Sequence, residues 1–141
     1  MTIICKYYDG KTPNTSVPLS DIEKIKQHNV DCFGNSSYIN NSEYACLYKN
    51  NELAASLCFI SRKYLSNVCT PTLNRKQGFQ KKLFDFTLKE IYDRYNLNYV
   101  YLFTENDERG IIPKKVYRKM GWYFGGQDYF NDRQFMYHFP R

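Results

Sequence analysis

The sequence is poor in the residues that usually build metal sites and cysteine-based nucleophiles. Its 141 residues include two histidines, His28 and His138, which lie far apart in the chain, and none of its five cysteines forms a CxxC pair. We therefore expect neither a metal site nor a cysteine–histidine nucleophile pair. Because the cysteines are odd in number and widely spaced, we also expect no disulfide framework and interpret most of them as small buried apolar residues.

Long apolar runs are also missing. No stretch approaches the roughly 18 residues that a membrane span requires, and the first ten residues lack the apolar segment of a secretory signal. We therefore expect a cytoplasmic protein that does not enter a membrane. Acidic residues are the scarcer charged class, because 14 Asp and Glu stand against 20 Lys and Arg. The resulting net charge of +6 favours an anionic partner.

The composition is otherwise that of a globular domain. Hydrophobic residues make up 43% of the chain, and 14 tyrosines and 10 phenylalanines are among its aromatic residues. This content is well clear of the composition of disordered chains. The length suits one hydrophobic core, so we expect a single domain over residues 1–141.

The apolar pattern predicts the element order β-α-β-β-β-α-β-α-β-β. Ser20 is the expected cap of the first helix, and the strand at 97–103 is apolar enough to be buried on both faces, as in parallel sheets. Residues 30–42 have no clear period and are expected as loop. The expected strands lie at 2–8, at three places within 43–72 with turns at 49–52 and 61–63, at 97–103, and on both sides of a loop at 125–132; the expected helices lie at 19–29, from about 79, and at 111–121.

One glycine stands among basic and amide side chains in the segment NRKQGFQKKLF, residues 74–84. The pattern places Gly78 between a strand and a helix, where several backbone N–H groups lack partners and the positive end of the helix dipole lies behind them. Such a place suits phosphate, because a residue without a Cβ lets the anion approach the backbone. A plain connection with a solvated basic rim fits the same pattern. The motifs of a P-loop and of a Rossmann turn are both absent.

Two segments match a known family in the same order. RKQGFQ, residues 75–80, is similar to the signature (Q/R)xxGx(G/A), and IPKKVYRKMGWYF, residues 112–124, is similar to a helix whose tyrosine is followed four residues later by glycine and an aromatic residue. Together they resemble the GNAT superfamily of acetyl-CoA-dependent N-acyltransferases. The resemblance covers about residues 44–125, and it departs from the signature at Gln80, where the family has glycine or alanine.

The resemblance implies an α/β fold with a central mixed sheet of about six to seven strands flanked by helices. The strand at 65–70 would splay from the strand at 97–103 and leave a wedge for the pantetheine arm of acetyl-CoA. An amine would attack the thioester directly, without an acyl-enzyme, so the thiol of Cys69 is not needed as a nucleophile. The residues that the resemblance assigns to the cosubstrate are Val68, Thr70, Arg75, Lys76, Gln77, Gly78, Phe79, Gln80, Lys81 and, after the later strand, Asn106.

The resemblance also assigns the chemistry. Tyr117 matches the family's tyrosine and would act as general acid for the leaving thiolate, although a packed core aromatic fits the same position. The strand before the signature carries no carboxylate. Glu105, followed by Asp107, is therefore the candidate general base, and a base acting through water is also allowed. Glu105 and Asp107 belong to the segment ENDE, residues 105–108, which also fits a plain solvated loop.

The predicted function is acetyl transfer from acetyl-CoA to a primary amine. The loops at 31–42 and 125–132 would shape the acceptor site, and their content is compatible with a small amine, a polyamine or a protein or peptide amine. A homodimer is compatible as well. Two alternatives stay open: a GNAT-like fold without catalysis that binds acyl-CoA or a partner, and a basic nucleic-acid-binding domain, which the interleaving of acidic with basic residues disfavours.

Overall fold

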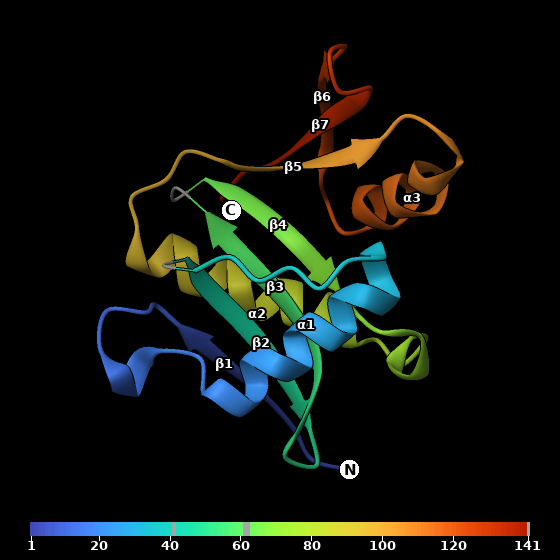
Figure 1. Ribbon diagram of the computed structural model, residues 1–141. Coiled ribbons are helices and arrows are strands. Elements are labelled where there is room, and N and C mark those ends of the chain that lie inside the picture. Colours follow the sequence, from blue (N-terminus) through green and yellow to red (C-terminus); the bar gives the residue numbers. More distant parts are fainter. Residues whose placement is uncertain (41, 61–62, 141) are drawn as a thin grey trace.

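Seven strands form one mixed sheet in the computed structural model, which describes residues 1–40, 42–60 and 63–140 (Figure 1). Neighbouring strands are antiparallel except β4 and β5, which are parallel. The predicted α/β class, mixed sheet and element order are confirmed. In chain order the elements are β1 (Ile3–Tyr8), α1 (Leu19–Phe33), β2 (Glu43–Lys49), β3 (Glu52–Ile60), β4 (Tyr64–Cys69), α2 (Phe79–Arg94), β5 (Val100–Glu105), α3 (Ile111–Lys119), β6 (Tyr123–Asp128) and β7 (Arg133–His138), and the sheet order is β1-β2-β3-β4-β5-β7-β6.

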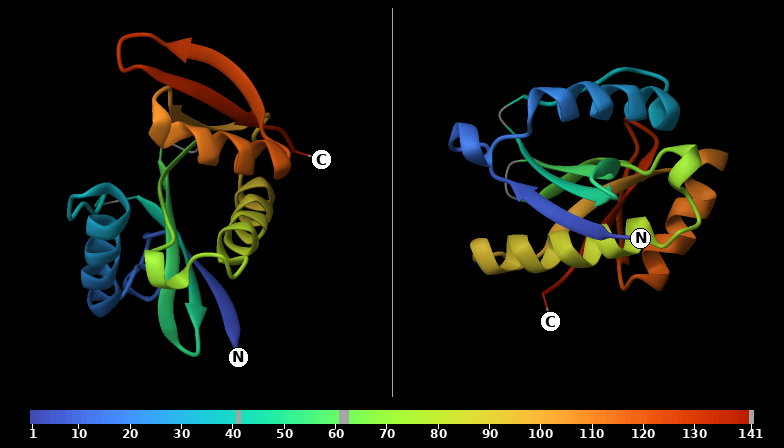
Figure 2. Two further views of the ribbon diagram at one scale, coloured as in Figure 1. Left: turned by 90° about the vertical axis from the view of Figure 1, so that its right-hand side faces the viewer. Right: turned by 90° about the horizontal axis from the view of Figure 1, so that it is seen from below.

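The first four strands lie between two helices, with α1 on one face and α2 on the other (Figure 2). Side chains of β2 alternate between the two faces, as the pleat of a strand requires. Leu47 belongs to the core that includes Phe84 of α2, whereas Cys46 belongs to a second core that includes Ile25 of α1. The centre of the sheet is therefore buried on both faces.

β5 is buried on one face only, which differs from the prediction. Val100 and Leu102 are buried, whereas the alternating Tyr101 and Phe103 are half-buried. The reason is that α1 packs against β3 and β4 and leaves this face of β5 to the aromatic side chains of β7. The strand also begins at Val100, later than the predicted start at residue 97.

The first helix is longer than predicted and is capped differently. Pro18 occupies the N-cap position, so the expected cap Ser20 lies inside the helix. The helix ends at Phe33, where Gly34 takes a left-handed conformation with φ of 78°. Val30 and Phe33 are 51% and 46% exposed, so the last turn adds nothing to the buried stripe and gave no apolar periodicity to recognise.

The closing hairpin has a shorter loop than predicted. β6 continues through Gly125 to Asp128, so the loop covers only residues 129–132. A shift in the β6–β7 register accommodates the glycine-rich part of the strand. Between β3 and β4, Ser61 and Arg62 of the predicted turn lie outside the described residues.

A disulfide joins Cys32 at the end of α1 to Cys69 at the end of β4. The sequence analysis expected no disulfide framework and did not predict this bond. The Cα atoms of the two residues are 5.9 Å apart, a usual separation for a disulfide. They are 37 residues apart in sequence, and only the packing of α1 on β4 brings them together. Cys46 and Cys58 are buried thiols, as expected, and Cys5 is half-buried.

In the described part of the chain, no helix is both long and apolar enough to cross a membrane. The same residues contain no group of three or more His, Cys, Asp or Glu side chains that could hold a metal ion. His28 lies on α1, and His138 at the end of β7 packs against the ring of Trp122 with the ring centres 5.3 Å apart.

Gly110 sets how closely α3 approaches the end of β5. A Cβ at this position would overlap the carbonyl group of Glu105. We expect Gly110→Ala to lower the free energy of unfolding by about 1–3 kcal/mol, because it overpacks a backbone contact. Gly126→Ala is the matched control, since nothing lies within 4 Å of a Cβ there. Thermal denaturation of both variants measures the effect, and equal melting temperatures would contradict it.

Candidate active site

The two parallel strands at the centre of the sheet separate almost as soon as they meet. Within the described residues, Tyr64 and Tyr101 are the one pair that joins β4 to β5. Beyond this pair β4 contains a bulge, because it has one residue more than β3 between the pairs Ser56–Cys69 and Cys58–Ser66. Asn67 within the bulge has a φ of 51°. A bulge bends its strand. Beyond Tyr64, no pairing with β5 is found in the described residues, so the opening has unpaired β4 backbone along one side.

Two connected cavities occupy this opening. The wedge cavity, of about 700 Å³, lies between β4 and β5. The loop cavity, of about 500 Å³, extends from it towards the start of α2 and is lined by Thr70, Arg75 and Gln80, among others. Both cavities share one set of lining residues, which we call the junction: Cys32, Phe33, Val68, Arg109, Pro113 and Tyr117.

The segment before α2 lies beside the loop cavity, whose lining includes Arg75 and Gln80. Lys76 and Gly78 both have positive φ, 62° and 76°, and Gly78 is the N-cap of α2. No side chain caps the helix, and its first turn contains no acidic residue. The positive end of the dipole of this 16-residue helix therefore has no acidic partner in the helix's own first turn. Nothing lies within 4 Å of a Cβ built on Gly78, so an anion has room to approach.

The basic side chains of this segment differ in their partners. The guanidinium of Arg75 donates from Nε to the carbonyl oxygen of Thr70 at 2.8 Å and lines the loop cavity. The Lys81 ammonium is paired with Asp85 of the same helix at 2.8 Å. Within this segment, Arg75 is therefore the basic residue that lines the loop cavity.

The C-terminal turn of α1 is fastened to the same region. The hydroxyl of Thr72 donates to Asp31 at 3.0 Å, and the backbone N–H of Thr72 donates to the same carboxylate. These hydrogen bonds lower the pKa of Asp31, the backbone N–H having the largest effect. With the adjacent disulfide, they hold the end of α1 against the cavity wall.

Tyr117 projects from α3 into the junction. Its ring packs against Phe84 and Trp122, with ring centres 5.5 Å and 6.0 Å apart, and the residue is only 7% exposed. Burial raises the pKa of its hydroxyl, which therefore stays protonated at neutral pH. The residue is thus both a packed core aromatic and part of the cavity wall.

The acidic segment after β5 is only partly directed to the cavity. Glu105 lines the wedge cavity and lies 3.6 Å from Arg109. Asp107 caps the following turn and accepts hydrogen bonds from Arg109, which lower its pKa. The side chain of Asn106 donates to Gln127 at 2.7 Å and accepts from Lys114 at 3.0 Å. Among the described residues, neither Asn106 nor Asp107 lines the wedge or the loop cavity.

Three features of the site were missed in the sequence. Asn67 marks the bulge, and its only sequence signal is that asparagine tolerates positive φ better than most residues. Arg109 reaches the junction from a turn that has no periodic pattern. The pair Cys32 and Cys69 had no signal at all, because contact between them depends on the packed fold.

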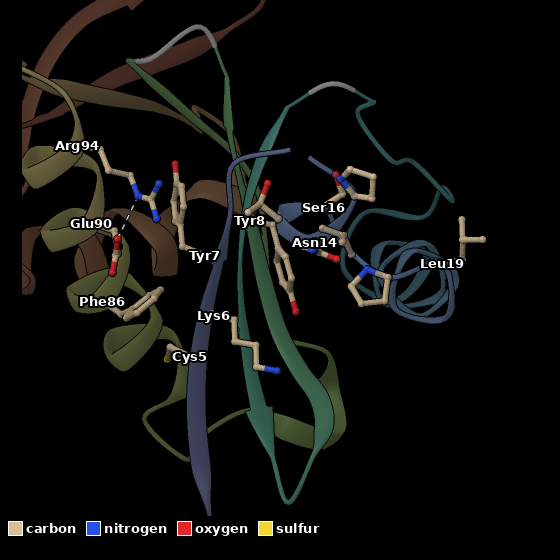
Figure 3. A pocket seen from close by; sticks show the side chains of 14 residues that line it. Cys5, Lys6, Tyr7, Tyr8, Asn14, Ser16, Leu19, Phe86, Glu90 and Arg94 are labelled. Carbon is tan, nitrogen blue, oxygen red and sulfur yellow. Dashed lines mark hydrogen bonds and ion pairs between the residues drawn. The ribbon is translucent and has the colours of Figure 1, made fainter. Parts of the chain in front are cut away.

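A larger hollow, of about 880 Å³, lies along β1, which is an edge strand separated from β5 by three other strands (Figure 3). Two of its charged side chains, Glu90 and Arg94, are already paired with each other. Arg94 is within 3.1 Å of Glu90 and 3.4 Å of Asp9, and the hydroxyl of Tyr7 donates to Glu43 at 2.9 Å. We place the chemistry in the wedge and loop cavities, because they lie between the separated strands β4 and β5 and the uncapped start of α2.

No family model matches the sequence, and no curated protein matches it. Solved structures match the fold over nearly the whole chain. An acyl-CoA N-acyltransferase from Pseudomonas aeruginosa has a TM-score of 0.74 at 12% identity, with 97% of this chain and 99% of that chain covered. The fold is that of the GNAT acetyltransferases. The resemblance seen in the two sequence segments is thereby confirmed for the fold.

Two further GNAT-fold structures carry names that specify an acceptor or ligand. An aminoglycoside 6'-N-acetyltransferase complexed with coenzyme A has a TM-score of 0.72 at 14% identity, with 98% of each chain covered. A spermidine N-acetyltransferase variant from Vibrio cholerae has a TM-score of 0.74 at 14% identity, with 97% of this chain and 93% of that chain covered. At these identities the likeness establishes the fold alone.

Proposed function

We propose that this protein is an N-acetyltransferase that moves an acetyl group from acetyl-CoA to a primary amine. The observation that carries the proposal is the opening between β4 and β5, which continues to the uncapped start of α2 at Gly78. A ligand that fits it must be long, must pair with extended backbone, and must end in an anion. The pantetheine arm and pyrophosphate of acetyl-CoA have this order.

The residues present suit that cosubstrate. Backbone groups near Val68 and Thr70, next to the bulge, would hold the pantetheine arm as an added strand would. The amides of residues 76–81 would hold the pyrophosphate, with positive charge from Arg75. Bound there, acetyl-CoA supplies an activated acyl group as a thioester. The role of Asn106 at the cosubstrate stays a prediction, since its side chain is bonded to β6 and α3.

Tyr117 and Glu105 are the proposed acid and base. The carbon–nitrogen bond forms as the carbon–sulfur bond breaks, so the amine must lose a proton and the thiolate must gain one. Glu105, on the wall of the wedge cavity, would accept the amine proton directly or through water. Tyr117, which remains protonated at neutral pH, would donate to the sulfur. The chain's remaining contribution is to position the two reactants.

The acceptor would enter at the end of the wedge cavity that Tyr64, Phe103 and Glu105 line. Aromatic faces beside a carboxylate favour a protonated amine as it arrives. Small amines, polyamines and peptide amines all meet this description. The named acceptors of two structural neighbours, spermidine and aminoglycosides, are the first compounds to test.

Acetyl-CoA is expected to stabilise the protein against unfolding. A ligand that binds only the native state adds about 2.7 kcal/mol at a concentration of one hundred times its dissociation constant. Thermal denaturation with and without acetyl-CoA measures the effect, and inorganic pyrophosphate controls for nonspecific anion binding. A folded protein whose melting temperature acetyl-CoA leaves unchanged would contradict the cosubstrate assignment.

A panel of amines incubated with acetyl-CoA then tests transfer itself. Release of the CoA thiol together with an acetylated amine, identified by mass, is the expected result. Stabilisation by acetyl-CoA without transfer to any amine of the panel would favour a fold that binds acyl-CoA and does not catalyse.

A further inference from the structure

The disulfide between Cys32 and Cys69 borders the place where the proposed reaction releases a thiol. Cys32 lines both the wedge and the loop cavity, as Tyr117 does. Cys69 is only 1% exposed and lies behind it at the end of β4. Cys32 is therefore the half-buried member of the pair on the cavity wall, and Cys69 is the buried one.

We infer that Cys32 is a modification site for free coenzyme A. This inference rests on the proposed function, because the CoA thiol must occupy the junction. The thiolate of CoA attacks Sγ of Cys32, and a CoA–Cys32 disulfide forms as the Cys32–Cys69 bond breaks. The bonding electrons leave with Sγ of Cys69, which takes up the proton that the CoA thiol gave up. One disulfide replaces another, so no outside oxidant or reductant is required.

The surroundings of the two sulfurs suit this direction of attack. The guanidinium Nη2 of Arg75 lies 4.0 Å from Sγ of Cys32, where it favours the approach of a thiolate. Sγ of Cys69 lies 3.2 Å from the backbone carbonyl oxygen of His28. In the disulfide this sulfur has no proton, but the released thiol would find an acceptor in place. The fold thus accommodates Cys69 in both states.

The exchange would be reversible and would control activity. A CoA molecule attached to Cys32 occupies the cavities that acetyl-CoA needs, so acetyl transfer stops. Cys69 stays next to the new disulfide and can attack it to restore the original bond and free CoA. The protein would therefore be switched off when CoA accumulates while acetyl-CoA is scarce.

The test incubates the oxidised wild-type protein with CoA in the absence of reductant and measures its intact mass. The expected product gains the full mass of one CoA, because the proton lost by the CoA thiol is kept on Cys69. Oxidative coupling of CoA to a free thiol such as Cys5 would instead add the mass of one CoA less two hydrogens. Peptide mapping is expected to place the adduct on Cys32, and acetyl transfer is expected to fall in proportion to the modified fraction and to return with reductant.

Three controls separate the possible failures. Desulfo-CoA, which lacks the thiol, reports cosubstrate binding by thermal stabilisation, and Cys32→Ser should keep this stabilisation while it loses the adduct. Glutathione at the same concentration is expected to open the disulfide far more slowly, because it does not bind the cavities. Stabilisation by desulfo-CoA without any adduct, an adduct on Cys5, or equal rates with glutathione would each overturn the inference and leave the proposed function standing. Absence of stabilisation by desulfo-CoA would overturn both.

Discussion

Replacing Tyr117 with phenylalanine is expected to lower kcat by roughly ten- to a thousandfold, which corresponds to about 1.4–4 kcal/mol of transition-state stabilisation. The substitution removes one oxygen and keeps the ring that packs on Phe84 and Trp122. The leaving thiolate then loses its proton donor, while the contacts that bind acetyl-CoA remain. The affinity for acetyl-CoA should therefore stay within about threefold of wild type, a change of less than 1 kcal/mol.

The pH dependence follows from the burial of the same hydroxyl. Burial raises its pKa above the ordinary value of about 10, so Tyr117 stays protonated throughout the neutral range. Loss of kcat attributable to Tyr117 should appear only above about pH 10. Tyr123→Phe on the exposed side of β6 is the matched control and should leave kcat unchanged. Equal kcat values for both variants, measured where chemistry limits turnover, would assign Tyr117 to packing alone.

Replacing Gly78 with valine is expected to weaken binding of acetyl-CoA by at least about tenfold, or about 1.4 kcal/mol. The open space beside Gly78 is where the pyrophosphate would approach, and a branched Cβ fills it. The residue also has a φ of 76°, which side chains with a Cβ adopt at a cost of roughly 1–2 kcal/mol. Some loss of stability is therefore expected together with the loss of affinity. Isothermal titration with CoA separates the two effects.

Gly34 offers a control with nearly the same backbone. Its φ is 78°, and nothing lies within 4 Å of a Cβ there either, but it ends α1 and does not precede α2. Gly34→Val should lose a similar amount of stability and keep its affinity for CoA. If both variants bind CoA as the wild type does, the segment before α2 is an ordinary connection.

The parts of the site that could be predicted are those that local sequence determines. Gly78 was predicted because a glycine between a strand and a helix has a local geometry of its own, and Tyr117 because the segment around it resembles the family's helix, whose tyrosine lies four residues before a glycine. The strand meander and the helices followed from periodicity. The fold comparisons confirm this architecture, whereas the roles of the individual residues remain proposals.

The parts that could not be predicted depend on contacts between distant segments. Cys32 and Cys69 meet only because α1 packs on β4. The exposed face of β5 depends on where α1 stops, and Tyr101 and Phe103 look equally apolar in either environment. The role of Asn106 at the cosubstrate stays a prediction, and the hydrogen bonds of its side chain with Gln127 and Lys114 could not be predicted from the sequence.

The short pairing between β4 and β5 divides the sheet into two halves. Strands β1 to β4 form one half and β5 to β7 the other, and in the described part of the chain their backbones meet at Lys63, Tyr64 and Tyr101. Side-chain packing beneath the two halves therefore determines how far they are separated, and backbone hydrogen bonds between them do not. The rings of Phe84, Tyr117 and Trp122 form part of that packing. Tyr117, which is proposed to protonate the leaving group, thus also helps to keep the two halves of the sheet separated.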